Sequence, residues 1–145
     1  MNRDRILADL VPHAGAMVLL DEVVSWDTQK VLCRTLSHRR ADNPLRRDGQ
    51  LSSTAVSEYA AQAAAVHGSL NDGAVPGGFL AALKDVRLTI DDLSGIDAPI
   101  LVEATRLMAD PAALLYTFRL YRDTPMTEEI ATGRLTVRLL DMEDA

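Results

Sequence analysis

The sequence predicts an α+β protein in which an antiparallel sheet wraps around one long central helix. Two observations support this prediction. Residues 51–70 place apolar side chains at helical spacing and carry small alanines on the other faces. Most of the remaining chain alternates apolar and polar residues with the period of two that is typical of strands. A single helix with small side chains and many strands favours a sheet curled around that helix.

The chain before the central helix is predicted to contain two strands. Residues 2–10 have the pattern of a short helix, and Pro12 should stop it because proline keeps the preceding residue out of the helical region. Strands are expected over residues 17–26 and 30–37, which are rich in Val and Leu. Residues 38–50 are polar and basic and contain proline and glycine, so we predict a loop there.

The central helix is unusual because it carries almost no charge. Glu58 is the single formal charge between residues 51 and 70. A carboxylate on a helix otherwise suited to burial is costly unless it is paired or hydrogen-bonded. Gln62 lies one turn further along and could share the hydrogen bonding of Glu58, although a purely structural role is equally open. The pattern therefore indicates a functional role for Glu58.

After the helix the chain returns to strands. The alternation predicts strands over residues 80–90, 100–108, 112–122 and 130–140. This order of elements fits a single domain spanning residues 1–145 and is the layout of the hotdog fold, with other α+β arrangements left open. One helix and a curved sheet leave an edge strand unpaired, so a dimer is expected.

Composition and charge limit the classes of function. The chain has 145 residues, 48% of them apolar, which is enough to bury a core. A net charge of −6 argues against nucleic acid as the main ligand. The lone cysteine, Cys33, excludes an internal disulfide, fits a reducing compartment and is interpreted as a core residue. No signal peptide or membrane-spanning run is recognisable, so we expect a cytoplasmic protein without a membrane partner.

Two side chains are candidates for proton transfer. His13 lies in a predicted turn before the first strand, and Glu58 lies on the central helix. An imidazole and a carboxyl group facing one apolar cavity can divide the work of an acid and a base. For His13 alone a structural or solvated role stays open, whereas His38 and His67 are interpreted as non-catalytic. No spacing of metal ligands or phosphate-binding loop is recognisable, so no metal or nucleotide is expected.

Four arginines, Arg39, Arg40, Arg46 and Arg47, cluster in the loop before the helix. One interpretation is a solvated basic loop. The other is a docking patch for an acidic partner or a phosphate group, because guanidinium groups bind both.

Two motifs together resemble a known family. The run PHAGAMVLLDEVVSWD, followed on the central helix by EYAAQAAAVHGSL, resembles the β-hydroxyacyl-acyl-carrier-protein dehydratases of the hotdog fold. Within that family the chain is most similar to the dehydratases of aryl-polyene-type pigment pathways, which have a PH-x-G-x-M-x-L-L-D opening and an E-Y-x-A-Q helix. The segments GGFLAALKDVRL and GRLTV extend the resemblance over most of the chain.

The resemblance implies a reaction and the residues that perform it. The reaction would be dehydration of a 3-hydroxyacyl thioester on acyl carrier protein to the trans-2-enoyl thioester, in fatty-acid or polyene-type biosynthesis. His13 would remove the proton next to the thioester carbonyl, and Glu58 would help the β-hydroxyl leave as water. The two residues would come from different subunits of a dimer, either a homodimer or a pair with a related dehydratase subunit.

The resemblance also implies how substrate is bound. Backbone N–H groups of Ser53 and Thr54 would bind the thioester oxygen, since helix N-termini offer free donors. Gln62 and Gly78 are further expected substrate contacts. The acyl group would arrive on the phosphopantetheine arm of the carrier protein, and no other cofactor is expected. Because carrier proteins are acidic, the four loop arginines would form their docking patch.

Two alternatives stay open. A hotdog thioesterase would use Glu58 to activate water and would release a free acid. A non-catalytic hotdog subunit would pair with an active dehydratase or hold acyl carrier protein. The second alternative is favoured by Ser52-Ser53, which stands where related dehydratases often have glycine or proline.

Overall fold

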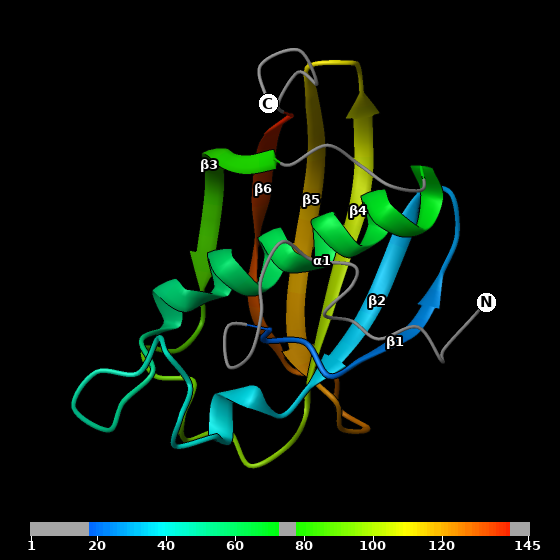
Figure 1. Cartoon of the computed structure of the whole chain (residues 1–145). Helices are drawn as coiled ribbons and strands as arrows, with labels where there is room; N and C mark the ends of the chain where they lie inside the picture. Colours follow the sequence, from blue (N-terminus) through cyan, green and yellow to red (C-terminus); the bar gives the residue numbers. More distant parts are fainter. Residues whose placement is uncertain (1–17, 73–77, 140–145) are drawn as a thin grey trace.

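The computed structural model describes residues 18–72 and 78–139. Helix α1 lies across one face of a six-stranded antiparallel sheet (Figure 1). The elements are β1 Glu22–Trp26, β2 Lys30–Thr35, α1 Val56–Asp72, β3 Gly78–Leu88, β4 Ile100–Ala109, β5 Ala113–Arg122 and β6 Glu129–Leu139. The predicted architecture, an antiparallel sheet around one long helix, is confirmed.

The order of the strands in the sheet differs from their order in the chain. The sheet runs β1-β2-β4-β5-β6-β3, so β2 pairs with β4 and β3 pairs with the last strand, β6. Helix α1 therefore connects strands in opposite halves of the sheet and crosses its face on the way (Figure 1). The first turns of α1 lie near the β3 edge of the sheet, and its last turns lie near β2 and β1 (Figure 1).

Small side chains let α1 lie close to the sheet. Ala60, Ala63 and Ala64 are fully buried, as is Tyr59 beside them. The strand residues that share this core include Val31, Cys33, Val102, Ala104 and Leu120, all fully buried. Burial of apolar surface contributes on the order of 25 cal/mol per Å², and the alanine face allows this burial without separating helix from sheet.

The helix begins later than the sequence predicted. The prediction placed its start at Leu51, whereas α1 begins at Val56 after the short 3-10 helix η4, Ser53–Ala55. The reason is that residues 51–53 pair with the segment after β3. Leu93 N–H donates to the Leu51 carbonyl at 2.7 Å, and Ser53 N–H donates to the Asp91 carbonyl at 2.8 Å. These bonds hold the chain extended before the helix.

The first two strands are also shorter than predicted. The first was expected from residue 17 but begins at Glu22, because the Leu19 backbone bonds to side chains of Gln62 and Thr35 instead of following the strand ladder. The second ends at Thr35, since Ser37 begins the 3-10 helix η3, Ser37–Arg39. The four later strands match their predicted bounds to within two residues. The short helix predicted over residues 2–10 lies outside the described residues.

Strands β5 and β6 approach closely where Gly133 faces Phe118. A Cβ atom on Gly133 would lie 2.6 Å from Phe118 Cζ and 2.8 Å from Phe118 Cε2. Both distances are well below van der Waals contact. Glycine at this position therefore allows the Phe118 ring to pack against the β6 backbone.

Strand β3 forms one edge of the sheet and pairs only with β6 among the described strands. Residues 81–89 are all exposed, and they include the apolar side chains of Leu83, Val86 and Leu88. An edge strand with exposed apolar side chains is a surface suited to pairing with another chain. In the described part of the chain, no helix combines the length and the apolar character needed to cross a membrane.

Candidate active site

Glu58 occupies the first turn of α1 and is half-buried. Its neighbours on the helix are more deeply enclosed, since Tyr59 is fully buried and Gln62 is 1% exposed. Gln62 Nε2 donates to Glu58 Oε1 at 3.4 Å. The predicted sharing of hydrogen bonds between Gln62 and Glu58 is therefore present. The carboxyl group sits at the boundary between the core and solvent, where a reacting group can be both ordered and accessible.

The other end of the Gln62 amide contacts a different part of the chain. Gln62 Oε1 accepts a hydrogen bond from the Leu19 backbone N–H at 2.9 Å. Leu19 is fully buried and lies in the segment that leads into β1. Gln62 was expected to contact substrate, but in this structure both ends of its amide are bonded within the protein. Its position links the helix to the segment before β1.

A chain of buried hydroxyl groups continues from Leu19 back to the helix. Thr35 Oγ1 donates to the Leu19 carbonyl, and the Thr35 and Ser37 hydroxyl oxygens are 2.9 Å apart. Ser37 Oγ lies 2.7 Å from Tyr59 Oη. These hydrogen bonds form a closed ring of polar groups, which we call the polar ring. Its members are Glu58, Gln62, Leu19, Thr35, Ser37 and Tyr59. The peptide bond between Glu58 and Tyr59 closes the ring.

Burial raises the pKa of Tyr59, and hydrogen bonds with Ser37 and Asn43 oppose this only in part. The phenol therefore stays protonated and able to donate at neutral pH. Asn43 Nδ2 donates to Tyr59 Oη at 3.1 Å. Because the Thr35 hydroxyl uses its one proton on a carbonyl, the Ser37 hydroxyl donates to Thr35 and Tyr59 donates to Ser37. One proton arrangement thus satisfies these buried groups.

The backbone donors expected to bind the thioester oxygen are already bonded within the chain. Ser53 N–H donates to the Asp91 carbonyl at 2.8 Å. Thr54 N–H donates to Ser52 Oγ at 3.3 Å, a longer and weaker bond. The Leu51 N–H is held nearby by Asp92 Oδ1 at 3.0 Å. A substrate oxygen at Ser53 would have to replace the Asp91 carbonyl.

The remaining predicted site residues fall in different places. His13 lies outside the described residues, so its role stays a prediction. Gly78 is the first residue of β3, and its backbone pairs with Leu139 of β6. The structure thus brings Glu58 and Gln62 together on α1 and places Gly78 on a different element.

Two of the four loop arginines bind the loop itself, and the other two bind residues outside it. Arg46 donates to the carbonyls of Arg40, Gly49 and His38 at 2.7 to 2.9 Å. Arg47 donates to two carbonyls of the same loop. Arg39 donates to the Ile96 carbonyl and pairs with Asp97, and Arg40 pairs with Asp21. Arg46 therefore stabilises the loop fold, whereas Arg39, Arg40 and Arg47 keep exposed surface.

Two histidines are buried and serve the packing of the core. His67 Nε2 donates to the Asp27 carbonyl at 2.9 Å, and His67 Nδ1 lies 2.7 Å from Tyr116 Oη. His38 Nε2 donates to the Ile96 carbonyl at 3.1 Å, while its Nδ1 is buried without a hydrogen-bond partner. Burial lowers the pKa of His38, and hydrogen bonds to backbone carbonyls oppose this shift. The imidazole of His38 is therefore neutral at pH 7.

Cys33 is fully buried in β2, and burial raises the pKa of its thiol to about 12. Such a thiol is not a nucleophile at neutral pH, which agrees with its interpretation as a core residue. Among the residues that the structure describes, no group of His, Cys, Asp and Glu side chains is arranged to hold a metal ion.

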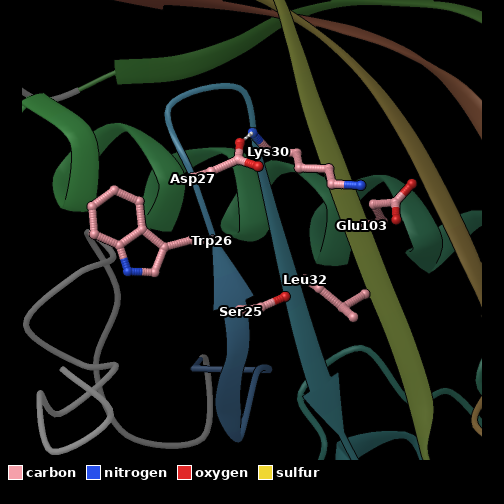
Figure 2. A pocket seen from close by; sticks show the side chains of 6 residues that line it. All are labelled: Ser25, Trp26, Asp27, Lys30, Leu32 and Glu103. Carbon is pink, nitrogen blue, oxygen red and sulfur yellow. Dashed lines mark hydrogen bonds between the residues drawn. The ribbon is translucent and has the colours of Figure 1, made fainter. Parts of the chain in front are cut away.

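A small surface pocket lies beside β1, β2 and β4 (Figure 2). Its lining residues are Ser25, Trp26, Asp27, Lys30, Leu32 and Glu103. Leu32 and Glu103 face each other across β2 and β4, and the residues next to them, Val31 and Ala104, are fully buried under α1. Since side chains alternate along a strand, this pocket opens on the opposite face of the sheet from α1. It is not part of the site around Glu58.

The polar ring was only partly predictable from the sequence. Glu58 and Gln62 were found because a charge and an amide interrupt an apolar helix. Thr35 and Ser37 lie in a predicted strand, where nothing in the alternation marks them as partners of a helix residue. Two polar residues at the inward-facing end of a strand are only a weak sequence signal of a buried hydrogen-bond network. The contact of Ser37 with Tyr59 could not be predicted from the sequence, because it depends on how the strand and the helix pack together.

The architecture is that of the hotdog fold, and comparison with known proteins agrees. A family model described as ApeP dehydratase, of the ApeP-like family, matches residues 6–144. The chain therefore belongs to the ApeP-like dehydratase family. No curated protein sequence matches the chain.

Solved structures with the same fold include dehydratases and thioesterases. The dehydratase heterocomplex ApeI:P from Xenorhabdus doucetiae matches with a TM-score of 0.82 and 21% identity, over 98% of this chain and 95% of that one. Zebra fish thioesterase superfamily member 2 matches with a TM-score of 0.66 and 20% identity, over 92% and 91% of the two chains. AziG from S. sahachiroi matches with a TM-score of 0.63 and 12% identity, over 85% and 92%.

Proposed function

We propose that this protein dehydrates a 3-hydroxyacyl thioester, carried on acyl carrier protein, to the trans-2-enoyl thioester. The observation that carries the proposal is Glu58, a half-buried carboxyl group at the start of a buried helix, in a chain of the ApeP-like dehydratase family. A carboxyl group in that position is enclosed enough to be ordered and open enough to reach a substrate. The natural setting would be fatty-acid or polyene-type biosynthesis in the cytoplasm.

The proposed reaction assigns one proton transfer to each of two residues. His13 takes the proton from the carbon next to the thioester carbonyl, and Glu58 gives a proton to the β-hydroxyl group. The C–H and C–O bonds break, water leaves, and the electron pair of the C–H bond forms the new double bond. General acid–base catalysis of this kind contributes about 10²–10⁴-fold to a rate. No cofactor takes part beyond the phosphopantetheine arm that carries the acyl group.

We further propose that the working form is a pair of hotdog subunits in which His13 and Glu58 come from different chains. The exposed apolar edge of β3 supports this, because it offers unpaired backbone groups beside Leu83, Val86 and Leu88. The similarity to a structure described as a dehydratase heterocomplex supports a related dehydratase subunit as the partner. A homodimer is the alternative assembly.

Acyl carrier protein would dock on the exposed surfaces of Arg39, Arg40 and Arg47. All three residues are exposed, although each is bonded to a neighbouring part of the chain. An acidic partner could exchange these local contacts for its own carboxylates at modest cost, since exposed ion pairs contribute only about 0.2–1 kcal/mol. Arg46 is not part of this patch because its three bonds to loop carbonyls hold the loop together.

A second candidate function is a non-catalytic subunit that binds acyl carrier protein and supports an active partner. The observation that favours it is the Ser53 N–H, which is bonded to the Asp91 carbonyl at 2.8 Å rather than left for a thioester oxygen. In this case the chain would bind the carrier protein and its acyl group without turning it over.

The test uses the full chain alone and co-purified with a related dehydratase subunit. Each sample is mixed with 3-hydroxyacyl carrier protein, and the acyl group is analysed by mass spectrometry for loss of water. We expect turnover that is abolished by Glu58→Gln. The matched control is Glu103→Gln, a carboxylate on the opposite face of the sheet, which should retain full activity.

Three other results would each favour a different account. Release of free thiol with simple acyl thioesters would favour a thioesterase. Binding of the carrier protein without turnover in either sample would favour the non-catalytic subunit. Turnover that survives in both His13→Ala and Glu58→Gln would contradict the mechanism.

A further inference from the structure

Gln62 is the only residue of the polar ring whose side chain bonds both to Glu58 and to the segment before β1. Its amide orientation is determined by these contacts. A backbone N–H can only donate, so the atom facing Leu19 is the carbonyl oxygen of the amide, and the amino group must face Glu58. A flipped amide would lose both bonds. The carboxyl group therefore always meets a donor at this point.

The position of Gln62 is itself determined by the sheet. The Leu19 carbonyl accepts from Thr35 Oγ1 on β2, so the Leu19 peptide is held on both sides. Thr35 connects through Ser37 to Tyr59, which is the residue after Glu58. Thr35, Ser37, Tyr59 and Gln62 are all no more than 1% exposed. The ring thus ties the first turn of α1 to β2 through hydrogen bonds that water does not reach.

The buried amide of Gln62 also restricts the orientation of the Glu58 carboxyl group. A glutamate side chain has three rotatable bonds, and a half-buried one can adopt several orientations. A bond to one carboxyl oxygen restricts the plane of the carboxyl group. Since Leu19 lies in the segment before β1, the same amide relates the position of Glu58 to that segment.

We propose that Gln62 is a positioning residue, which orients the Glu58 carboxyl group by bonding it to the rigid peptide of Leu19. The inference rests on the proposed dehydratase function, and it replaces a role for Gln62 as a substrate contact. A positioning residue affects the turnover of bound substrate and leaves substrate affinity unchanged. Misplacement of a reacting group by about 1 Å can cost on the order of 100-fold in rate.

Two substitutions separate the two bonds. Gln62→Glu keeps an oxygen for the Leu19 N–H and replaces the donor to Glu58 with a second carboxylate. Gln62→Met has a similar length and removes both bonds without adding charge. The control is Gly133→Ala, which disturbs the packing of Phe118 in the core and leaves the contacts of Gln62 with Glu58 and Leu19 intact.

The measurements are kcat and KM for a 3-hydroxyacyl carrier protein, together with thermal midpoints. We expect kcat to fall by about 10- to 100-fold in both Gln62 variants with KM unchanged. Gly133→Ala should lower the thermal midpoint and keep kcat near the wild-type value. A rise in KM with kcat unchanged would overturn the inference in favour of substrate binding. An equal loss of kcat in Gly133→Ala would overturn it in favour of a general effect of lower stability.

A readout that does not depend on turnover separates this inference from the proposed function. Crystal structures of the wild type and of Gln62→Met show directly whether the Glu58 carboxyl group moves. If the wild type does not turn over substrate, the proposed function fails, and the crystal structures still decide the role of Gln62. A carboxyl group that keeps its wild-type orientation in Gln62→Met would overturn the inference, and a rotated one would support it.

Discussion

The backbone N–H of Ser53 donates to the carbonyl of Asp91 at 2.8 Å, at the point where the chain enters the helix that carries Glu58. A thioester oxygen bound at the same N–H would compete with that carbonyl. Asp92 stabilises the arrangement, because its carboxylate accepts from the Leu51 and Ser94 N–H groups. A substrate oxygen that bound at Ser53 would therefore disturb the hydrogen bonds to the segment after β3.

This competition gives a prediction for nuclear magnetic resonance. A non-reactive amide analogue of a 3-hydroxyacyl pantetheine should shift the Ser53 amide signal, because an oxygen of the ligand replaces the Asp91 carbonyl as acceptor. The amide signal of Arg122 serves as the reference that should not change. The Arg122 N–H donates to the Glu128 carbonyl, and both residues are far from Ser53 in the sequence. A saturated complex in which the Ser53 signal is unchanged would count against an oxyanion role for this residue.

The exposed edge of β3 gives a prediction about assembly. We expect Leu83→Lys and Val86→Lys to weaken pairing with a partner chain, since lysine on an edge strand opposes the addition of another strand. Leu107→Lys, at an exposed position of similar chemistry on β4, is the matched control. Sedimentation equilibrium would measure the change. Equal assembly of the β3 variants and the wild type would show that the subunits pair elsewhere.

His38 gives a prediction for the dependence of stability on pH. Burial lowers its pKa below the ordinary value of 6.5, so the unfolded chain binds a proton at a higher pH than the folded chain. Stability from the neutral imidazole is therefore complete above pH 6.5 and is lost as the pH falls through the lower pKa of the folded state. The slope from this one group is at most about 1.4 kcal/mol per pH unit.

Urea denaturation from pH 8 to pH 5 measures this slope. His38→Gln keeps a donor for the Ile96 carbonyl and does not titrate, so its free energy of unfolding should depend less on pH than that of the wild type. Parallel curves for the two proteins would mean that His38 does not titrate differently on folding.

The contact between Gly133 and Phe118 gives a prediction about packing. Gly133→Ala would place a methyl group 2.6 Å from the Phe118 ring, which must then move within the core. Overpacking of this kind typically costs about 1–3 kcal/mol. Gly95→Ala is the control, because its Cβ would meet no atom within 4 Å. Chemical denaturation should show a lower free energy of unfolding for Gly133→Ala and no change for Gly95→Ala.

The fold was predictable because it follows from local patterns. Alternation identified β4, β5 and β6, and the alanine-rich apolar run identified α1, since both patterns are set by which face of an element is buried. The predicted start of α1 was wrong because long-range hydrogen bonds with Asp91 and Leu93 hold the preceding residues in an extended conformation. Such contacts join parts of the chain that no local pattern relates.

The site was less predictable than the fold. Glu58 stood out as a charge in an apolar helix, and its bond to Gln62 follows from helical spacing. The Leu19 peptide and the Thr35 hydroxyl did not stand out, because both lie in an ordinary strand pattern. The loop arginines were clustered as the sequence indicates, but Arg46 uses its guanidinium group on loop carbonyls, which depends on how the loop folds.

The central claim is that Glu58 donates the proton with which the β-hydroxyl group leaves as water. Because the reaction is reversible, the most direct measurement incubates the protein and its partner subunit with trans-2-enoyl carrier protein in heavy-oxygen water. Mass spectrometry then locates the label. The account predicts heavy oxygen at the β-hydroxyl group with the wild type and no incorporation with Glu58→Gln. Heavy oxygen in a released carboxylic acid, or equal β-labelling by the wild type and Glu58→Gln, would contradict it.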